Sequence, residues 1–361
     1  MTIKTNIPET KIPGSYTEYN YYAGPNGLPA NVQKILLIGD VSEEGALEAN
    51  KPTAVYTEVE ALNLAGAGSV LHQMYQAAKN AWKYAQITLL RHSAVAGSKA
   101  LWKIAVENPE DKTGATAAGS VSVFYNKSRV SVGVAVGDSA ETVAANLVLA
   151  VNADTSAPFI ASADEGEVTL TAKSNGAYIS AAKGGVKVSV STKGTDISVG
   201  EPDLTAGVGE VDIKSALKAA FPERYHLIAL PVCDADNLTL LKDHLMDAAA
   251  PLEQRGQRGI AAVVVDGVNA ATSIAKAKNC ERLHIAAVKN SIPSAAWEIS
   301  AALAAVFLSY RRLKKDEDYA YSAAMIWALF GIMLRHASAS GFNGQYIHII
   351  VGSSLSILMI L

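Results

Sequence analysis

Residues 34–39 read KILLIG, a short run of aliphatic residues that ends at a glycine. An apolar run of this length, bounded by turn residues, is typical of a strand that is buried on both faces. A second run, QITLLR, occupies 86–91, and between the two the apolar residues of 70–84 have helical spacing behind Ser69, the predicted N-cap. Residues 34–91 therefore predict the first part of an α/β sheet.

Helical and strand patterns alternate again from residue 212 onward. We expect strands over 225–231, 259–265 and 283–288, and helices over 213–220, 235–250, 270–277 and 295–308. This alternation favours a mainly parallel sheet with helices on both faces. Residues 34–91 and the residues from 212 onward show the same alternation of strands and helices. The sequence therefore predicts a single two-sided α/β core domain whose two parts are separated in the chain.

The residues between the two parts of the core show a different hydrophobic pattern. Apolar and small polar residues alternate at period two, which is typical of half-buried antiparallel strands, over 102–107, 119–125, 129–136, 167–172 and 186–191. Residues 138–152 have helical spacing, with Asp138 or Ser139 as the N-cap. We expect an inserted β-rich module with one helix that leaves and re-enters the core near Gly97, Gly207 and Gly209, in loops that tolerate an insertion.

These patterns divide the chain into five parts. They are an extended N-terminal arm (1–30), the first part of the α/β core (31–97), the inserted β-rich module (98–208), the second part of the core (209–310) and an apolar C-terminal segment (311–361). A chain of 361 residues is long enough for two or three compact units.

Composition excludes several classes of function. Half of the residues are apolar and 18% are charged, which excludes a disordered chain. The net charge of -3 provides no basic field, so we expect no nucleic-acid partner. Two cysteines cannot form a disulfide framework or a four-ligand zinc site. The apolar stretches 323–334 and 347–361 are each shorter than the roughly 20 residues that a spanning helix needs.

Signatures of catalysis are missing from the sequence. It contains no GxSxG, HExxH, GxxxxGK[ST] or CxxC, and the Gly66-x-Gly68 pair before a helix lacks the third glycine of a dinucleotide fingerprint. Single residues remain as weak candidates. Those that follow predicted strands are Asp234, Asp236, Asp266 and Cys233, and we interpret the aspartates as helix caps and the cysteine as an ordinary thiol. His226 and His284 lie within predicted strands and His244 lies within a predicted helix, and we interpret them as core or surface histidines. We expect no catalytic, metal or cofactor site.

The N-terminal arm is rich in tyrosine and punctuated by proline, a composition that suits an extended segment. Such a strand either packs on its own domain or is donated to the sheet edge of another chain. Successive side chains of a strand point to opposite faces, so Tyr19 and Tyr21 share one face while Tyr16 and Tyr22 share the other.

The order of several short motifs resembles Mu-like bacteriophage tail sheath proteins. The resemblance begins with IPGSYTE at 12–18, GLPA at 27–30 and KILLIG at 34–39. It continues over roughly residues 7–308 through Gly66-x-Gly68-Ser69, Val130-Ser131-Val132, Gly137-Asp138-Ser139, Asn152-Ala153-Asp154 and Pro293-x-x-Ala296-Trp297-Glu298.

The resemblance implies a structural subunit of a contractile tail sheath, present in the virion tail and in the host cytoplasm during assembly. Such subunits polymerise around a tail tube and contract to drive the tube through the bacterial envelope. Implied partners are further copies of the chain in a ring or helix, the tail tube protein, and baseplate and tail terminator proteins. The arm residues that the resemblance assigns to linking neighbouring subunits are Ile12, Pro13, Gly14, Tyr16, Glu18, Tyr19, Tyr21 and Tyr22.

The sequence departs from the resemblance after about Tyr310, where 311–361 cannot be matched to it. We interpret this segment as the product of a frame change or truncation, which removes a C-terminal linking strand. Two other classes stay open: an α/β enzyme with an inserted substrate-binding module, which requires Asp234, Asp266 and His284 to converge, and a membrane-associated protein.

Removal of residues 1–22 tests the arm. If the arm is ordered only against a neighbouring subunit, as we expect, the melting temperature of the α/β core stays nearly unchanged while assembly is abolished. Thermal melts and negative-stain microscopy measure the two effects. A truncated chain that unfolds, or that still forms cylinders, contradicts the linking role.

Overall fold

The computed structural model describes residues 33–265 and 267–316. A six-stranded sheet in the order β14-β13-β12-β1-β3-β2 forms the core, and four of its five pairings are parallel. Its strands are β1 (Lys34–Gly39), β2 (Thr53–Val55), β3 (Gln86–Arg91), β12 (Leu227–Ala229), β13 (Arg258–Val264) and β14 (Leu283–Val288). The KILLIG strand lies in the middle, where Ile35 to Ile38 are fully buried.

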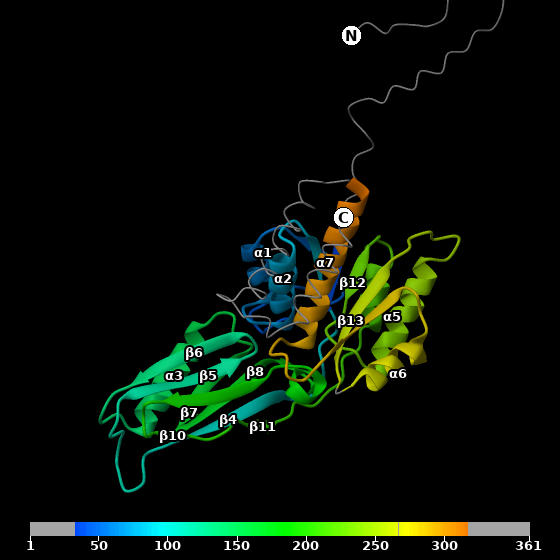
Figure 1. The fold of residues 1–361 in the computed structure, drawn as a ribbon. Coiled ribbons are helices and arrows are strands. Elements are labelled where there is room, and N and C mark those ends of the chain that lie inside the picture. Colours follow the sequence, from blue (N-terminus) through cyan, green and yellow to red (C-terminus); the bar gives the residue numbers. More distant parts are fainter. Residues whose placement is uncertain (1–32, 266, 317–361) are drawn as a thin grey trace, which may run out of the picture. The chain divides into compact units, whose positions relative to one another are not determined.

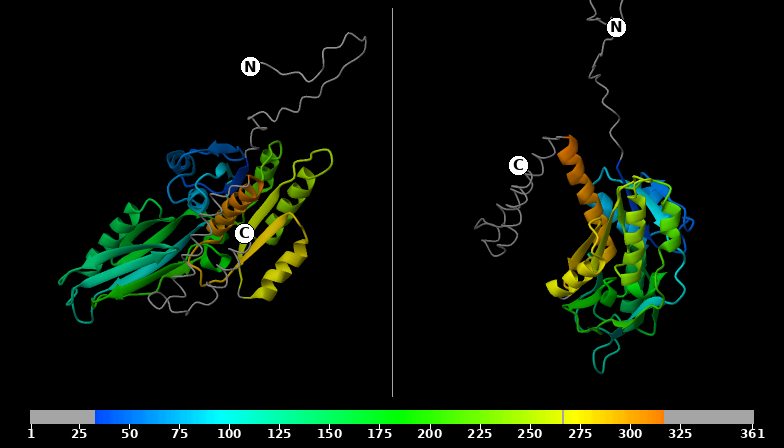
Figure 2. Two further views of the ribbon diagram at one scale, coloured as in Figure 1. Left: turned by 45° about the horizontal axis from the view of Figure 1, so that its top comes forward. Right: turned by 90° about the vertical axis from the view of Figure 1, so that its right-hand side faces the viewer.

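Helices cover both faces of this sheet (Figures 1 and 2). The helices of the core are α1 (Glu58–Ala65), α2 (Val70–Ala81), α4 (Lys214–Ala220), α5 (Ala235–Ala248), α6 (Val268–Lys278) and α7 (Ala296–Asp316). Strand order runs one way from β1 to β3 and the other way from β12 to β14, so right-handed crossovers place α2 and the pair α5 and α6 on opposite faces. Helix α7 packs beside α2, against β12 and β13.

Between β3 and α4 the chain forms two further antiparallel sheets. Strands β4 (Lys99–Glu107), β7 (Phe159–Asp164), β8 (Glu167–Asn175), β10 (Ser198–Val199) and β11 (Asp203–Thr205) make a five-stranded sheet, and β5 (Gly119–Tyr125), β6 (Ser128–Val134) and β9 (Val188–Lys193) make a three-stranded one. Helix α3 (Ala140–Ala153) and two short 3-10 turns, Ala177–Ile179 and Ala181–Lys183, complete this part.

The mixed α/β class is confirmed, as are the N-caps Ser69 and Ser139, which accept hydrogen bonds from His72 N and Thr142 N at 3.2 Å. Several bounds are wrong. Helix α2 ends at Ala81 rather than residue 84, since Trp82 already has extended backbone, and β12 is only three residues long. Elements α1, β2, β7, β10 and β11 were not expected. The division into domains stays a prediction, and the arm (1–30) and 317–361 lie outside the described residues.

We call the two antiparallel sheets between β3 and α4, with α3 and the two 3-10 turns, the module, and the rest of the described residues the core; the chain passes from core to module and back at a single point. Ser98 and Val208 exchange both backbone hydrogen bonds, with Ser98 N to Val208 O at 3.1 Å and Val208 N to Ser98 O at 3.2 Å. Gly97 and Gly209 flank this pair at positive φ, and a Cβ on Gly97 would lie 1.8 Å from Val208 O. The two chain segments touch so closely that only glycine fits beside the pair.

A second close approach joins module and core at Gly68. This residue has φ +69°, and a Cβ on it would lie 2.0 Å from the carbonyl oxygen of Ala157 in the module. The module also reaches the same turn through Lys173, whose Nζ donates to Ala67 O at 2.8 Å. The contact therefore requires a residue without a side chain at position 68.

Gly68→Ala should lower the free energy of unfolding by at least about 1–3 kcal/mol, the usual cost of a non-glycine residue held in left-handed backbone, with the steric clash adding to it. Urea unfolding measures the change. Gly133→Ala is the matched control, because Gly133 has open space around its Cβ position and no positive φ. Equal effects of the two substitutions would contradict this reading of the junction.

Candidate functional site

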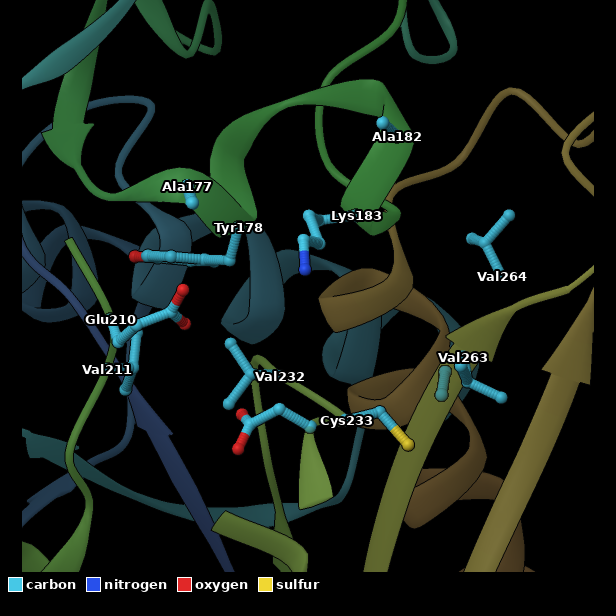
Figure 3. Close-up of a pocket in the computed structure, with 12 residues that line it drawn as sticks. Ala177, Tyr178, Ala182, Lys183, Glu210, Val211, Val232, Cys233, Val263 and Val264 are labelled. Carbon is cyan, nitrogen blue, oxygen red and sulfur yellow. The ribbon is translucent and has the colours of Figure 1, made fainter. Parts of the chain in front are cut away.

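The strand-end crevice of the core is the place where an α/β sheet usually binds a ligand. Strand order reverses between β1 and β12, and ligands of open α/β sheets bind outside the carboxyl ends of the strands at such a point. A pocket of about 170 Å³ lies at the carboxyl ends of the neighbouring strands β12 and β13, and its lining includes the module residues Tyr178 and Lys183 together with Val232 and Cys233 (Figure 3). Part of the inserted module thus lies over the position where a substrate would enter.

One carboxylate that lines this crevice, that of Asp234, has a structural role. Asp234 caps α5: its Oδ1 accepts from Asn237 N at 2.9 Å and its Oδ2 from Asn237 Nδ2 at 2.8 Å. Burial, together with the charge of Asp234, raises the pKa of the Cys233 thiol to about 12, and Figure 3 shows the sulfur pointing toward the β13 side of the pocket. A thiol with this pKa is almost entirely protonated near neutral pH, so Cys233 is a poor nucleophile.

Two of the three residues that the enzyme alternative requires, Asp234 and His284, do not converge. His284 lies near the amino end of β14 and is the register partner of Ile260, while Asp234 follows the carboxyl end of the parallel strand β12. The His284 ring contacts Phe307, and its Nε2 lies 3.3 Å from Arg258 Nη1. Asp266 lies outside the described residues. The structure therefore holds Asp234 and His284 at opposite ends of the sheet.

The other single candidates lie apart as well. His226 precedes β12, at the amino edge of the sheet, where its Nδ1 accepts from Lys34 N at 3.2 Å. His244 is buried on α5 against Gln257 and the ring of Phe221. Asp236 lies in the first turn of α5. Within residues 33–265 and 267–316, no three His, Cys, Asp or Glu side chains are grouped so that they could hold a metal ion.

The Gly66-x-Gly68 turn does not form a phosphate site. A Cβ on Gly66 would lie 2.0 Å from Ser42 Oγ, and the approach of Ala157 fills the space above Gly68. The first turn of α2 is capped by Ser69, and Leu71 N donates to Asp40 O at 3.0 Å. A contact within the core thus accounts for Gly66, and a contact between core and module accounts for Gly68.

Strand β14 is a free edge of the core sheet. Among the described strands it pairs only with β13, in parallel. Gly259 N donates to Arg282 O at 2.9 Å and Val265 N donates to Val288 O at 3.0 Å, so the even-numbered residues of β14 bond to β13. Because the direction alternates along a strand, the backbone N–H and C=O of Ile285 and Ala287 point away from the sheet.

Apolar surface lies next to this edge. The strand reads LHIAAV, without lysine, arginine, aspartate, glutamate or proline, the residues with which proteins commonly protect an exposed edge. Helix α7 packs against β14, and three of its apolar side chains, Leu303, Val306 and Tyr310, are between 38% and 46% exposed. Sequence reasoning missed this edge. The uncharged sequence of the last predicted strand, 283–288, was the available signal.

The linking residues predicted in the arm, Ile12 to Tyr22, lie outside the described residues, so their role stays a prediction. No helix of the described chain combines the length and the apolar character that a bilayer crossing requires. The exposed edge of β14 is the feature of the described residues best suited to binding an extended segment.

Sequence comparison finds a phage tail sheath protein as a relative of this chain. The relative is the Mu-like prophage FluMu tail sheath protein of Haemophilus influenzae, 27% identical over 173 residues, which make up 47% of this chain and 34% of the relative. The chain thus spans about a third of the length of that relative. The resemblance to Mu-like tail sheath proteins is confirmed by this match. No family model matches the chain.

Two solved structures are also similar to parts of the chain. A sheath tail protein of Listeria innocua is 14% identical with a TM-score of 0.32, covering 76% of this chain and 55% of its own. A sheath tail protein of Desulfitobacterium hafniense is 14% identical with a TM-score of 0.34, covering 81% and 61%. With TM-scores below 0.5, these likenesses support no argument about the fold.

The raised pKa of Cys233 predicts slow alkylation. In a Cys280→Ser chain, iodoacetamide at pH 8 should modify native Cys233 at least about tenfold more slowly than the unfolded chain. A pKa of about 12 in place of the ordinary 9.0 lowers the thiolate fraction at pH 8 about a thousandfold, and the stronger nucleophilicity of the more basic thiolate recovers only part of this loss. Mass spectrometry over time measures both rates. Modification of native Cys233 at the rate of the unfolded chain would show that the thiol is exposed and reactive.

Proposed function

We propose that this chain is a structural subunit of a contractile phage tail sheath. The match to the tail sheath protein of Haemophilus influenzae carries the proposal, and the order of the sequence motifs agrees with it. Its role is mechanical rather than catalytic. The positions of Asp234 and His284 at opposite ends of the sheet give the enzyme alternative no support.

Assembly proceeds through strand donation. The arm of one copy adds to β14 of another, where the outward backbone groups of Ile285 and Ala287 pair with it. Side chains on one face of the added strand lie beside the exposed apolar residues of α7, and those on the other face lie on the side of α6. The α7 side supplies an apolar surface for one face of the arm, which carries either Tyr19 and Tyr21 or Tyr16 and Tyr22.

The remaining features of a sheath follow from this role. The subunits form a ring or helix around a tail tube protein, end at baseplate and terminator proteins, and contract to drive the tube through the host envelope. They assemble in the host cytoplasm and function in the virion tail, without nucleic acid or membrane as a partner. The core domain comprises 31–97 and 209–310, and the inserted module 98–208 faces the outside of the sheath.

Negative-stain microscopy of the purified full chain tests the proposal. Hollow cylinders or stacked rings are the expected result. A monodisperse monomer at high concentration would contradict it, and comparison with a chain that lacks 311–361 shows whether that segment affects assembly.

Ala287→Pro tests the β14 edge. Proline removes the outward N–H that an added strand needs, while the β13 ladder uses the neighbouring even-numbered residues, so we expect loss of assembly with a melting temperature within a few degrees of the unmodified chain. Light scattering and thermal melts measure the two effects. Ala287→Ser is the matched control and should assemble. A proline variant that forms normal cylinders would place the acceptor elsewhere.

A further inference from the structure

The inserted module also contains a free strand edge. Strand β7 pairs only with β8 among the described strands, in an antiparallel hairpin that turns at Glu165 and Gly166. Asp164 and Glu167 flank the two-residue turn and form a hydrogen-bonded pair. Hydrogen-bonded and non-hydrogen-bonded pairs alternate along the hairpin, so Ser162 and Ile160 also bond to β8. The backbone groups of Phe159, Ala161 and Ala163 therefore point away from β8.

One side chain occupies the middle of this edge. Asn152, in the last turn of α3, accepts a hydrogen bond from Ala161 N at 2.8 Å with its Oδ1 and donates to Ala161 O at 2.9 Å with its Nδ2. The amide thus makes the two bonds that a neighbouring strand would make with the same residue. Asp154, two residues later, holds the end of α3 in place, because its Oδ1 accepts from Ser156 N at 2.8 Å and its Oδ2 accepts from the Tyr125 hydroxyl.

Three further edge strands are protected in different ways. The outer strands of the three-stranded sheet carry exposed charges, Arg129 on β6 and Lys193 on β9. Strand β2 is only three residues long. Charge and shortness are both common protections against unwanted strand addition. Strand β14 has neither protection and no side chain that bonds to its outward groups among the hydrogen bonds of the described chain.

We propose that Asn152 determines the specificity of subunit linking by blocking strand addition at β7, so that the arm of a second copy of this chain is directed to β14. The proposal rests on strand donation as the proposed function for the choice of ligand. The block itself is a property of the module and is tested separately. Asn152→Ala uncovers the N–H and C=O of Ala161 and makes β7 a second acceptor.

A photo-crosslinking experiment tests the proposal with the full chain. The probe is a synthetic peptide of residues 1–22 in which Tyr19 is replaced by benzoylphenylalanine. It is added to the unmodified chain and to Asn152→Ala, Ala287→Pro and the double variant, and the cross-linked residues are mapped by mass spectrometry. Asn146→Ala, at another exposed position of α3, is the matched control.

The two sites give independent results. We expect cross-links near β14 and α7 in the unmodified chain, additional cross-links within 159–164 in Asn152→Ala, and only those within 159–164 in the double variant. A folded Asn152→Ala chain, verified by circular dichroism, that forms no cross-links on β7 overturns the proposed block. Cross-links near β14 that persist in Ala287→Pro contradict the acceptor site instead. Asn152→Asp keeps the oxygen that accepts from Ala161 N but loses the N–H that donates to Ala161 O. If the alanine variant fails to fold, the aspartate variant should still form cross-links within 159–164, at lower yield.

Discussion

The pair of backbone hydrogen bonds between Ser98 and Val208 is the constraint on which the rest of the structure depends. The chain leaves the core after β3, forms two complete sheets, and must return before α4 without disturbing the six-stranded sheet. It does so because both segments pass through one point, where Gly97 and Gly209 allow the backbones to touch. The core sheet can therefore be built from two distant stretches of sequence as though they were continuous.

A second set of contacts ties the module to the start of α7. Trp297 Nε1 donates to Gln73 Oε1 of α2 at 2.9 Å, and its ring meets Tyr178 of the module edge-on. Beside it, Glu298 forms an ion pair with Lys127 at 3.2 Å, yet burial raises the pKa of its carboxyl. An acid whose folded-state pKa is raised favours the folded state at acidic pH and opposes it above that pKa. The pair therefore fixes the position of the module rather than adding to stability.

How far the sequence predicts this molecule depends on whether the signal is local. The strands β1, β3 and β14 and the caps Ser69 and Ser139 are encoded by adjacent residues, and they were predicted at or near their observed bounds. Strand β7, FIASAD, was missed because exposed and acidic residues interrupt its alternation. The roles of Gly68 and Asn152 depend on partners in other elements, Ala157 and Ala161, and short-range patterns do not specify such contacts. The same holds for the free edge of β14, which is defined by the strand order of the whole sheet.

The narrow connection at Ser98 and Val208 allows the module to be exchanged during evolution. Since the two ends of the insertion already meet as neighbouring residues of a ladder, recombination could exchange one outer module for another, or for a tight turn, without re-registering the core strands. A replacement would still have to cover Trp297, because Tyr178 contacts it from the module. Lineages that diversify their outer surface by such exchanges should keep the glycines of the connection and an aromatic or large apolar residue over Trp297.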